Sequence, residues 1–130
     1  FMIQGGGFKA GLNRQNAKRT VVNESIGGLS NVHGSIAMAR TNNPDSASSQ
    51  FFINHKDNGF LDGKPNQSGY TVFGQVIEGL EIVDLIANVK VTNKKGMANV
   101  PVDDVIIKTI RYASESVIEE FYKTLLSLKK

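Results

Sequence analysis

The sequence predicts a mainly β domain that contains one short helix and is followed by a helical tail. Three observations support this fold class: short apolar runs between turn formers, a change to helical spacing near residues 79–89, and a second amphipathic stripe after residue 113. The chain has 130 residues, of which 40% are hydrophobic and 21% charged, which is typical of one globular domain with a core. We therefore expect a β domain over residues 1–112 and a tail over residues 113–130.

Short apolar stretches between turn-forming residues predict the strands. Residues 1–3 (FMI) are typical of the inner end of a strand, which the glycines at positions 5–7 interrupt. Residues 34–40 (GSIAMAR), 49–54 (SQFFIN) and 69–77 (GYTVFGQVI) are separated by segments rich in Asn, Asp, Gly and Pro. Residues 105–112 (VIIKTIRY) alternate between two sets of side chains and predict a final strand.

Two stretches have the apolar spacing of helices. Residues 79–89 predict a short helix packed on the sheet, through Leu80, Ile82, Val83, Leu85, Ile86 and Val89. In the tail, Ser116 and Glu119 have the spacing of a capping box. A helix is predicted over residues 114–128, with an apolar stripe formed by Val117, Ile118, Phe121, Tyr122, Leu125 and Leu126. Such a stripe is expected to be buried, either on the domain or on a partner.

Composition argues against several classes of function. The formal net charge is only +3 and the basic residues are scattered, so no nucleic-acid surface is predicted. Cys is absent, which excludes disulfides and thiolate metal sites. No apolar run approaches the roughly 20 residues that a membrane-spanning helix needs. His33 and His55 are the two histidines, and neither belongs to a cluster of ligand residues in the sequence, so no metal is expected.

Two motifs of enzymes are present only in part. The segment GGGFKA fits a weak dinucleotide-binding pattern, but that pattern needs a helix directly afterwards. Residues 11–20 (GLNRQNAKRT) have almost no apolar face for such a helix, so we reject the motif. Ser48 and Ser49 have no evident base nearby in the pattern, so a hydrolase triad is not predicted either.

A group of large apolar residues lies beside the turns, interleaved with uncharged hydrogen-bonding side chains. The group consists of Phe1, Met2, Phe51, Phe52, Phe60, Leu61, Tyr70 and Phe73, with Gln4 and Gln50 between them. One interpretation is an ordinary β core with polar strand faces. The other is a shallow apolar pocket rimmed by amides, which suits a peptide better than a charged metabolite. The residues alone leave both interpretations open.

Five motifs in order resemble the cyclophilin family of peptidyl-prolyl cis-trans isomerases, in its bacterial style. They are FMIQGGGF, GSIAMAR, SASSQFFIN, FLDGK and YTVFGQVIEGLEIVD, and the resemblance extends over residues 1–112. It implies a closed eight-stranded antiparallel β-barrel covered by helices. It also implies isomerisation of X-Pro bonds in proteins, as an aid to folding, without metal or cofactor.

The resemblance also implies that this chain lacks part of the family's domain. In the family, FMIQGGGF follows two strands, a helix and a strand segment with FHRV, whose arginine is the main catalytic residue. No such segment occurs in this sequence. We expect an incomplete barrel, with no equivalent of that arginine. Arg40 follows AMA, where many relatives carry Asn, and is not its equivalent. An inactive fragment or a module that binds prolyl peptides therefore stays open as the alternative function.

Motif by motif, the resemblance implies roles for individual residues. Phe1, Met2, Phe52, Leu61 and Tyr70 would line the pocket for the proline ring. Gln4 and Gln50 would bond the peptide backbone, and the backbone at Ala39, Arg40 and Thr41 would pair with the extended substrate. Phe60 stands where many eukaryotic relatives have Trp, which implies weak cyclosporin binding.

The expected partners are proline-containing peptides and folding proteins, without nucleic acid or membrane. The expected compartment is the cytoplasm, with the periplasm left open.

Overall fold

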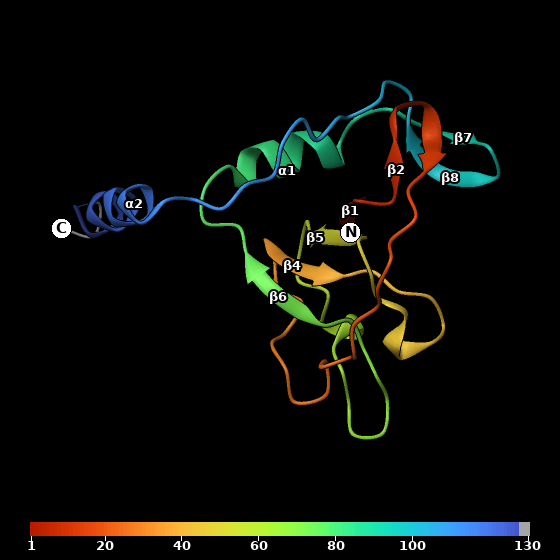
Figure 1. Cartoon of the computed structure of the whole chain (residues 1–130), viewed down its shortest axis with the longest axis horizontal. Coiled ribbons are helices and arrows are strands. Elements are labelled where there is room, and N and C mark those ends of the chain that lie inside the picture. Colours follow the sequence, from red (N-terminus) through yellow and green to blue (C-terminus); the bar gives the residue numbers. More distant parts are fainter. Residues whose placement is uncertain (128–130) are drawn as a thin grey trace.

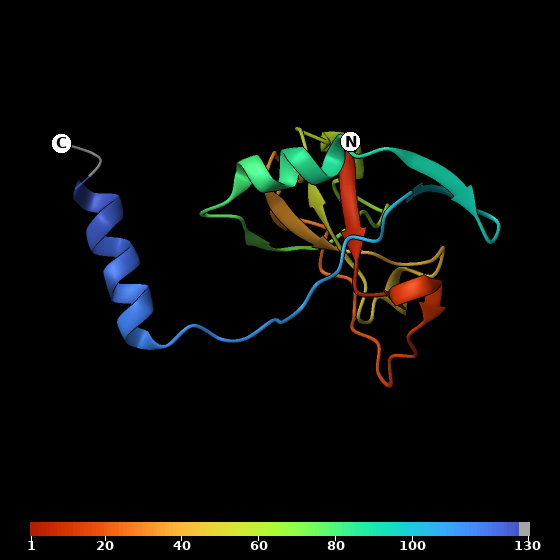
Figure 2. The same ribbon diagram turned by 90° about the horizontal axis from the view of Figure 1, so that it is seen from above.

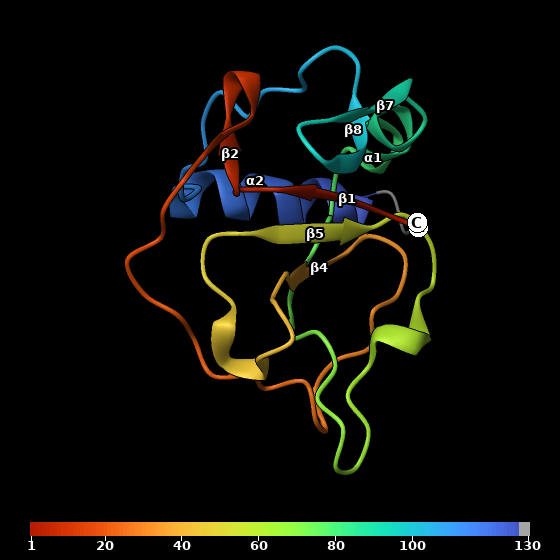
Figure 3. The same cartoon turned by 90° about the vertical axis from the view of Figure 1, so that its right-hand side faces the viewer.

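A four-stranded antiparallel sheet forms the centre of the molecule. In the computed structural model, which describes residues 1–127, its strands are β1 (Met2–Gly5), β4 (Ser35–Met38), β5 (Phe51–Asn54) and β6 (Val72–Gln75). They are arranged in the order β1-β5-β4-β6. Figure 3 shows β1, β5 and β4 side by side in this order. The three predicted internal strands are thus confirmed, with narrower bounds.

The register of the sheet separates its two faces. Phe52 on β5 is opposite Gln4 on β1 and Ala37 on β4, so these three side chains share a face. Ile53, the next residue of β5, is opposite Ile3 and belongs to the other face. The sheet is open within the described residues, with β1 and β6 at its edges, as expected for an incomplete barrel.

The helix α1 (Leu80–Ala87) confirms the helix predicted over residues 79–89. Gly79 precedes it with a left-handed backbone (φ 86°), which glycine adopts without strain. The helix lies against β1 and buries Val83, whereas Ile82 and Leu85 are exposed (Figure 1). Only part of the predicted apolar stripe therefore packs on the sheet.

The strand predicted over residues 105–112 is wrong. This segment has no regular secondary structure, and Val105, Ile106 and Ile110 are exposed. Alternation of side chains gives a strand only where a neighbouring strand accepts its backbone hydrogen bonds, and none of the described strands pairs with this segment. One side chain of the segment, Ile107, does reach the sheet and lies against Gly5.

Two hairpins outside the main sheet were not predicted from the sequence. The strands β7 (Val91–Lys94) and β8 (Met97–Pro101) are joined by Lys95 and Gly96, whose φ angles are both positive (51° and 77°). Two positive φ angles at a two-residue loop are the signature of a tight hairpin turn. The smaller hairpin pairs β2 (Phe8–Lys9) with β3 (Asn13–Arg14) across the 3-10 turn η1 (Ala10–Leu12).

The tail forms a helix close to the predicted residues, but this helix does not pack on the domain. The helix α2 (Glu115–Ser127) begins before Ser116, so Ser116 lies in its first turn and the predicted capping box is wrong. Leu128, the last residue of the predicted helix, lies outside the described residues. The segment of residues 102–114 carries α2 away from the sheet (Figure 2), and Val117, Tyr122 and Leu126 are exposed. Of the two expected ways to bury this stripe, docking on the domain is therefore wrong, and burial on a partner stays a prediction. No helix of the described residues is long and apolar enough to cross a membrane.

Candidate functional site

Two glycines let β1 and the segment before β5 approach each other closely. Gly6 has a φ of +82°, and a Cβ at this position would collide with the carbonyl of Ser49. A Cβ on Gly7 would lie 2.5 Å from Oε1 of Gln50. Because both glycines lack this atom, the Gln50 side chain lies over the end of β1. There its Oε1 accepts a hydrogen bond from Nε2 of Gln4 at 3.0 Å.

A shallow pocket of about 130 Å³ opens beside this pair of amides. Phe52 is its most buried member, with 3% exposure, and the Tyr70 ring meets the Phe52 ring edge-on at 5.6 Å. The wall and rim are completed by the other residues that line it: Phe1, Met2, Gln4, Ala39, Arg40 and Leu61.

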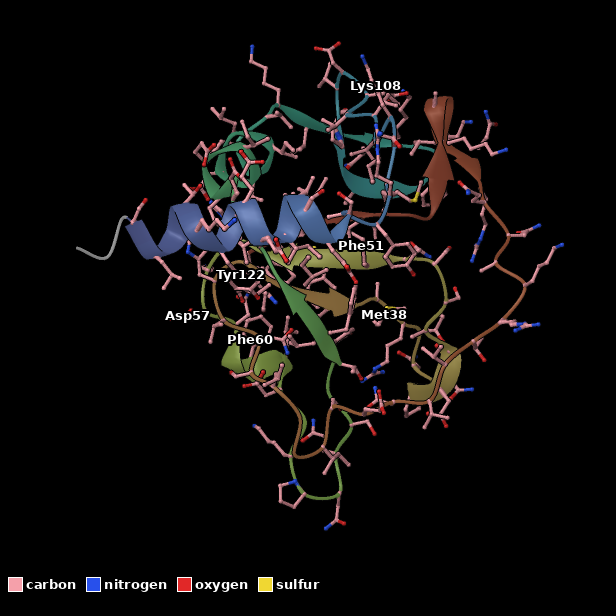
Figure 4. All side chains as sticks on the ribbon, turned by 60° about the vertical axis from the view of Figure 1, so that its left-hand side comes forward. Met38, Phe51, Asp57, Phe60, Lys108 and Tyr122 are labelled. Atoms are coloured by element: carbon pink, nitrogen blue, oxygen red, sulfur yellow. The ribbon has the colours of Figure 1, made fainter. Side chains whose placement is uncertain are left out.

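All of the lining residues belong to the set that the sequence predicted as substrate-binding, and three further members of that set lie outside the lining. Gln50 is joined to the pocket through Gln4. Phe60, on the 3-10 turn η3 (Gly59–Leu61; Figure 4), is 68% exposed. The centre of its ring lies 5.9 Å from the centre of the Phe1 ring. Thr41 lies apart, since its N–H and hydroxyl bond Ser46.

A second concave region of about 220 Å³ lies on the other side of Arg40. Its lining is mostly apolar and includes Val21, Val22, Met38 and Phe73. Although this region is larger, it holds only Arg40 of the predicted substrate-binding residues, together with Phe73 of the wider apolar group, and its sole acidic side chain is Glu24. The smaller pocket therefore remains the candidate site, because the predicted residues and the two amides gather there.

Sequence reasoning missed a network of buried asparagines behind the pocket. Asn31, Asn54 and Asn58 are all 0% exposed. Nδ2 of Asn58 donates to Oδ1 of Asn54 at 2.7 Å, and Nδ2 of Asn54 donates to Oδ1 of Asn31 at 3.1 Å and to the Ser35 hydroxyl at 2.9 Å. Buried amides are stable only when they are bonded in this way. The available signal is the position of Asn54, two residues after Phe52 in one strand and hence on the same buried face.

The network ends on both walls of the pocket. At one end, Nδ2 of Asn58 donates to the carbonyl of Phe1 at 2.8 Å. At the other end, Nδ2 of Asn31 donates to the carbonyl of Tyr70 at 3.2 Å and to Asp62 at 2.9 Å. These bonds join segments that are far apart in the sequence, so the network fixes the distance between the walls. Oδ1 of Asn58 has no hydrogen-bond partner among the described residues.

Asp62 closes this network with the only carboxylate in it. Burial tends to raise its pKa, but its carboxylate accepts bonds from the Ser30 hydroxyl at 2.5 Å and from the backbone N–H of Asn31 at 2.7 Å, besides the side-chain amide. These hydrogen bonds outweigh burial and hold the pKa of Asp62 below its ordinary value of 3.8. The ionised form is therefore the one that the fold stabilises.

We expect the stability of the chain to fall in acid because of Asp62. A carboxyl group whose pKa is lower in the folded state stabilises the fold above its unfolded pKa, and this contribution is lost as the pH falls through the folded pKa. Asp62→Asn should be less stable at neutral pH and should lose less on acidification below about pH 4. Urea unfolding from pH 6 to pH 2.5 measures both effects. Asp103→Asn, at an exposed position, is the control, and an equal acid dependence in Asp62→Asn and the wild type would contradict the role of Asp62.

The two histidines meet beside α1 rather than at the pocket. Nε2 of His55 lies 3.1 Å and Nε2 of His33 lies 3.7 Å from the same Asp84 oxygen. The described part of the chain contains no group of three or more His, Cys, Asp or Glu side chains suited to a metal ion. The contacts of His33 and His55 with Asp84 join α1 to the two loops that carry the histidines.

Comparison with known proteins places the chain in a family. The family model described as cyclophilin type peptidyl-prolyl cis-trans isomerase/CLD matches residues 1–112. A peptidyl-prolyl cis-trans isomerase of Acinetobacter baylyi is 47% identical over 114 residues, which cover 88% of this chain and 61% of that protein. Peptidyl-prolyl cis-trans isomerase A of Dickeya dadantii is 44% identical over 85% of this chain and 58% of its own length.

For a third relative, the match with this chain covers a larger share of the relative's length. Peptidyl-prolyl cis-trans isomerase B of Escherichia coli is 47% identical over 114 residues, or 85% of this chain and 69% of that protein. The chain thus spans about three fifths of the Acinetobacter and Dickeya relatives. With a family match over residues 1–112 of the 130, the chain belongs to the cyclophilin-type peptidyl-prolyl cis-trans isomerases.

Proposed function

We propose that this chain provides the proline-binding part of a peptidyl-prolyl cis-trans isomerase that acts on X-Pro bonds of folding proteins. The observation that carries the proposal is the pocket itself. Phe52 and Tyr70 form an apolar floor and wall of a size that suits a proline ring, and Gln4 lies at the rim with its amide bonded to that of Gln50, which offers amide groups for a peptide backbone.

The chemistry of the reaction explains why such a pocket is useful. Rotation about an X-Pro bond crosses a barrier of about 20 kcal/mol, because amide resonance is lost in the twisted state. No bond to the enzyme is needed, so catalysis requires tighter binding of the twisted amide than of either planar form. The apolar pocket holds the proline ring while the preceding residue rotates, and the rim amides keep the flanking backbone in place.

The other requirement is a donor for the proline nitrogen, which gains a localised lone pair as the amide twists. In the family this donor is the guanidinium of the FHRV segment, which this sequence does not contain. This observation favours a second candidate function, a module that binds prolyl peptides without fast turnover.

One set of measurements on the 130-residue chain separates the two functions. Titration of the ¹⁵N-labelled chain with an Ala-Pro peptide should shift the amide signals of Phe52, Leu61 and Tyr70. Exchange spectroscopy on the same samples, with EDTA present, should then report the rate of cis–trans exchange. Binding with enhanced exchange supports the isomerase, binding alone supports the module, and shifts that avoid these residues would contradict both.

We expect Gln50→Ala to weaken peptide binding more than it weakens the fold. The substitution removes the acceptor of the Gln4 amide and one proposed bond to the peptide, while Gln50 itself is only partly buried. A hydrogen bond contributes about 1 kcal/mol, so the Kd for an Ala-Pro peptide should rise about fivefold. Gln67→Ala, at an exposed loop position, is the matched control. A Kd unchanged in Gln50→Ala would remove Gln50 from the proposed site.

A further inference from the structure

Arg40 lines the candidate pocket, and its guanidinium is bonded to the backbone along its whole edge. Nε donates to the carbonyl of Gly69 at 2.9 Å, Nη2 donates to the carbonyl of Ser68 at 2.8 Å, and Nη1 donates to the carbonyl of Thr41 at 2.9 Å. No carboxylate of the described residues forms an ion pair with it. Each of the three nitrogens thus has a carbonyl partner that fixes the plane of the group.

The face of the same guanidinium covers the ring of Tyr70. Its central carbon lies 4.6 Å from the centre of that ring, a geometry in which a cation attracts the aromatic face. The Tyr70 ring in turn forms a T-shaped pair with the Phe52 ring, at the floor of the pocket. Arg40 therefore holds Tyr70 twice, through the carbonyls of the two preceding residues and through its ring.

The shape of the guanidinium is what makes these contacts compatible. A planar fork can bond adjacent carbonyls along its edge while its face stacks on a ring, whereas an ammonium group is a compact point charge that cannot do both. These contacts also turn the guanidinium toward the loop of residues 68–70. It is therefore not free to replace the missing guanidinium of the family at the proline nitrogen.

From these contacts we infer that Arg40 is a positioning residue of the pocket. It fixes the loop of residues 68–70 and thereby sets Tyr70 against Phe52. The resemblance did not assign this role to the Arg40 side chain. The inference rests on the proposed function only for the identity of the ligand, a prolyl peptide. The arrangement of Arg40 and Tyr70 is testable without any peptide.

The test compares Arg40→Lys and Arg40→Ala with Lys64→Ala in the full 130-residue chain. Lys64 is exposed on the neighbouring loop, so Lys64→Ala removes a positive charge without touching Tyr70. The first measurement is hydrogen exchange of the Tyr70 amide, which donates to the carbonyl of Leu61 at 2.8 Å. The second measurement is the Kd for an Ala-Pro peptide.

Both Arg40 variants should accelerate Tyr70 exchange and raise the Kd about five- to tenfold, whereas Lys64→Ala should leave both unchanged. Wild-type affinity and wild-type Tyr70 exchange in Arg40→Lys would overturn the inference, since charge alone would then suffice. Loss of isomerisation in Arg40→Lys with unchanged Kd would overturn it as well, because Arg40 would then act on the reacting bond.

Two further readouts cover the remaining outcomes. If Arg40→Ala does not fold, the wild-type Nε–H signal of Arg40 decides, and rapid exchange of that proton with solvent would contradict the bond to Gly69. If the wild type binds no peptide, the proposed function fails, while the Tyr70 exchange rates still test the role of Arg40.

Discussion

Phe52→Ala is expected to bring the chain close to unfolding. Phe52 is the largest buried apolar side chain of the described residues, and it lies in the central part of the sheet between Gln4 and Ala37. Truncation of a buried phenylalanine costs about 3–5 kcal/mol, because packing is lost and a cavity remains. Whole domains are stable by only about 5–15 kcal/mol, so this loss is a large part of the total.

Thermal and urea unfolding monitored by circular dichroism measure this effect. Phe60→Ala is the matched control, since the same side chain is removed where it is 68% exposed, and it should cost less than about 1 kcal/mol. Equal losses in the two variants would mean that Phe52 does not form the core of the sheet. Where Phe52→Ala still folds at low temperature, it should bind an Ala-Pro peptide more weakly than Phe60→Ala does.

The second large effect concerns catalysis by the chain itself. This sequence does not contain the FHRV segment, whose arginine is the donor to the proline nitrogen. One oriented donor to developing charge is typically worth a factor of about 10²–10³ in rate. We therefore expect the kcat/KM of the chain on a proline peptide to be lower by about that factor than the kcat/KM of the Escherichia coli relative. Affinity for the peptide should change much less, since the pocket residues are present. The rate constants come from a protease-coupled assay, and the affinities come from NMR titration. The relative serves as the positive control, and a rate equal to that of the relative would show that a residue within these 130 supplies the donor.

Strands could be predicted from the sequence where an apolar run and its flanking turns agreed. Residues of β4 and β5 satisfy both conditions, and both strands form. The segment of residues 105–112 has the alternation without a partner strand, which no local pattern reveals. The hairpin β7–β8 has the opposite problem, because β7 is largely polar and the signal for the hairpin lies in the turn at Lys95 and Gly96.

The candidate site divides in a similar way. Phe52 and Tyr70 could be placed at a pocket only through the order of the motifs, since apolar residues near turns fit a plain core equally well. The position of Asn54 on the face of Phe52 is a signal for one member of the asparagine network. The network as a whole could not be predicted, because Asn is typical of loops and turns when it is considered singly. Its burial follows from the meeting of Asn31, Asn54 and Asn58 in three dimensions, which depends on the whole sheet.

The use of amides behind the pocket has a consequence for the response of the site to ionic strength. From the carbonyl of Phe1 to the carbonyl of Tyr70, the connection runs through Asn58, Asn54 and Asn31, and none of these side chains is charged. Dissolved ions screen attraction between charges, but they have little effect on buried hydrogen bonds between neutral groups. The part of the pocket's width that these three asparagines set should therefore be the same in dilute buffer and in molar salt. A peptide that binds through its proline ring should then show an affinity that barely responds to added sodium chloride.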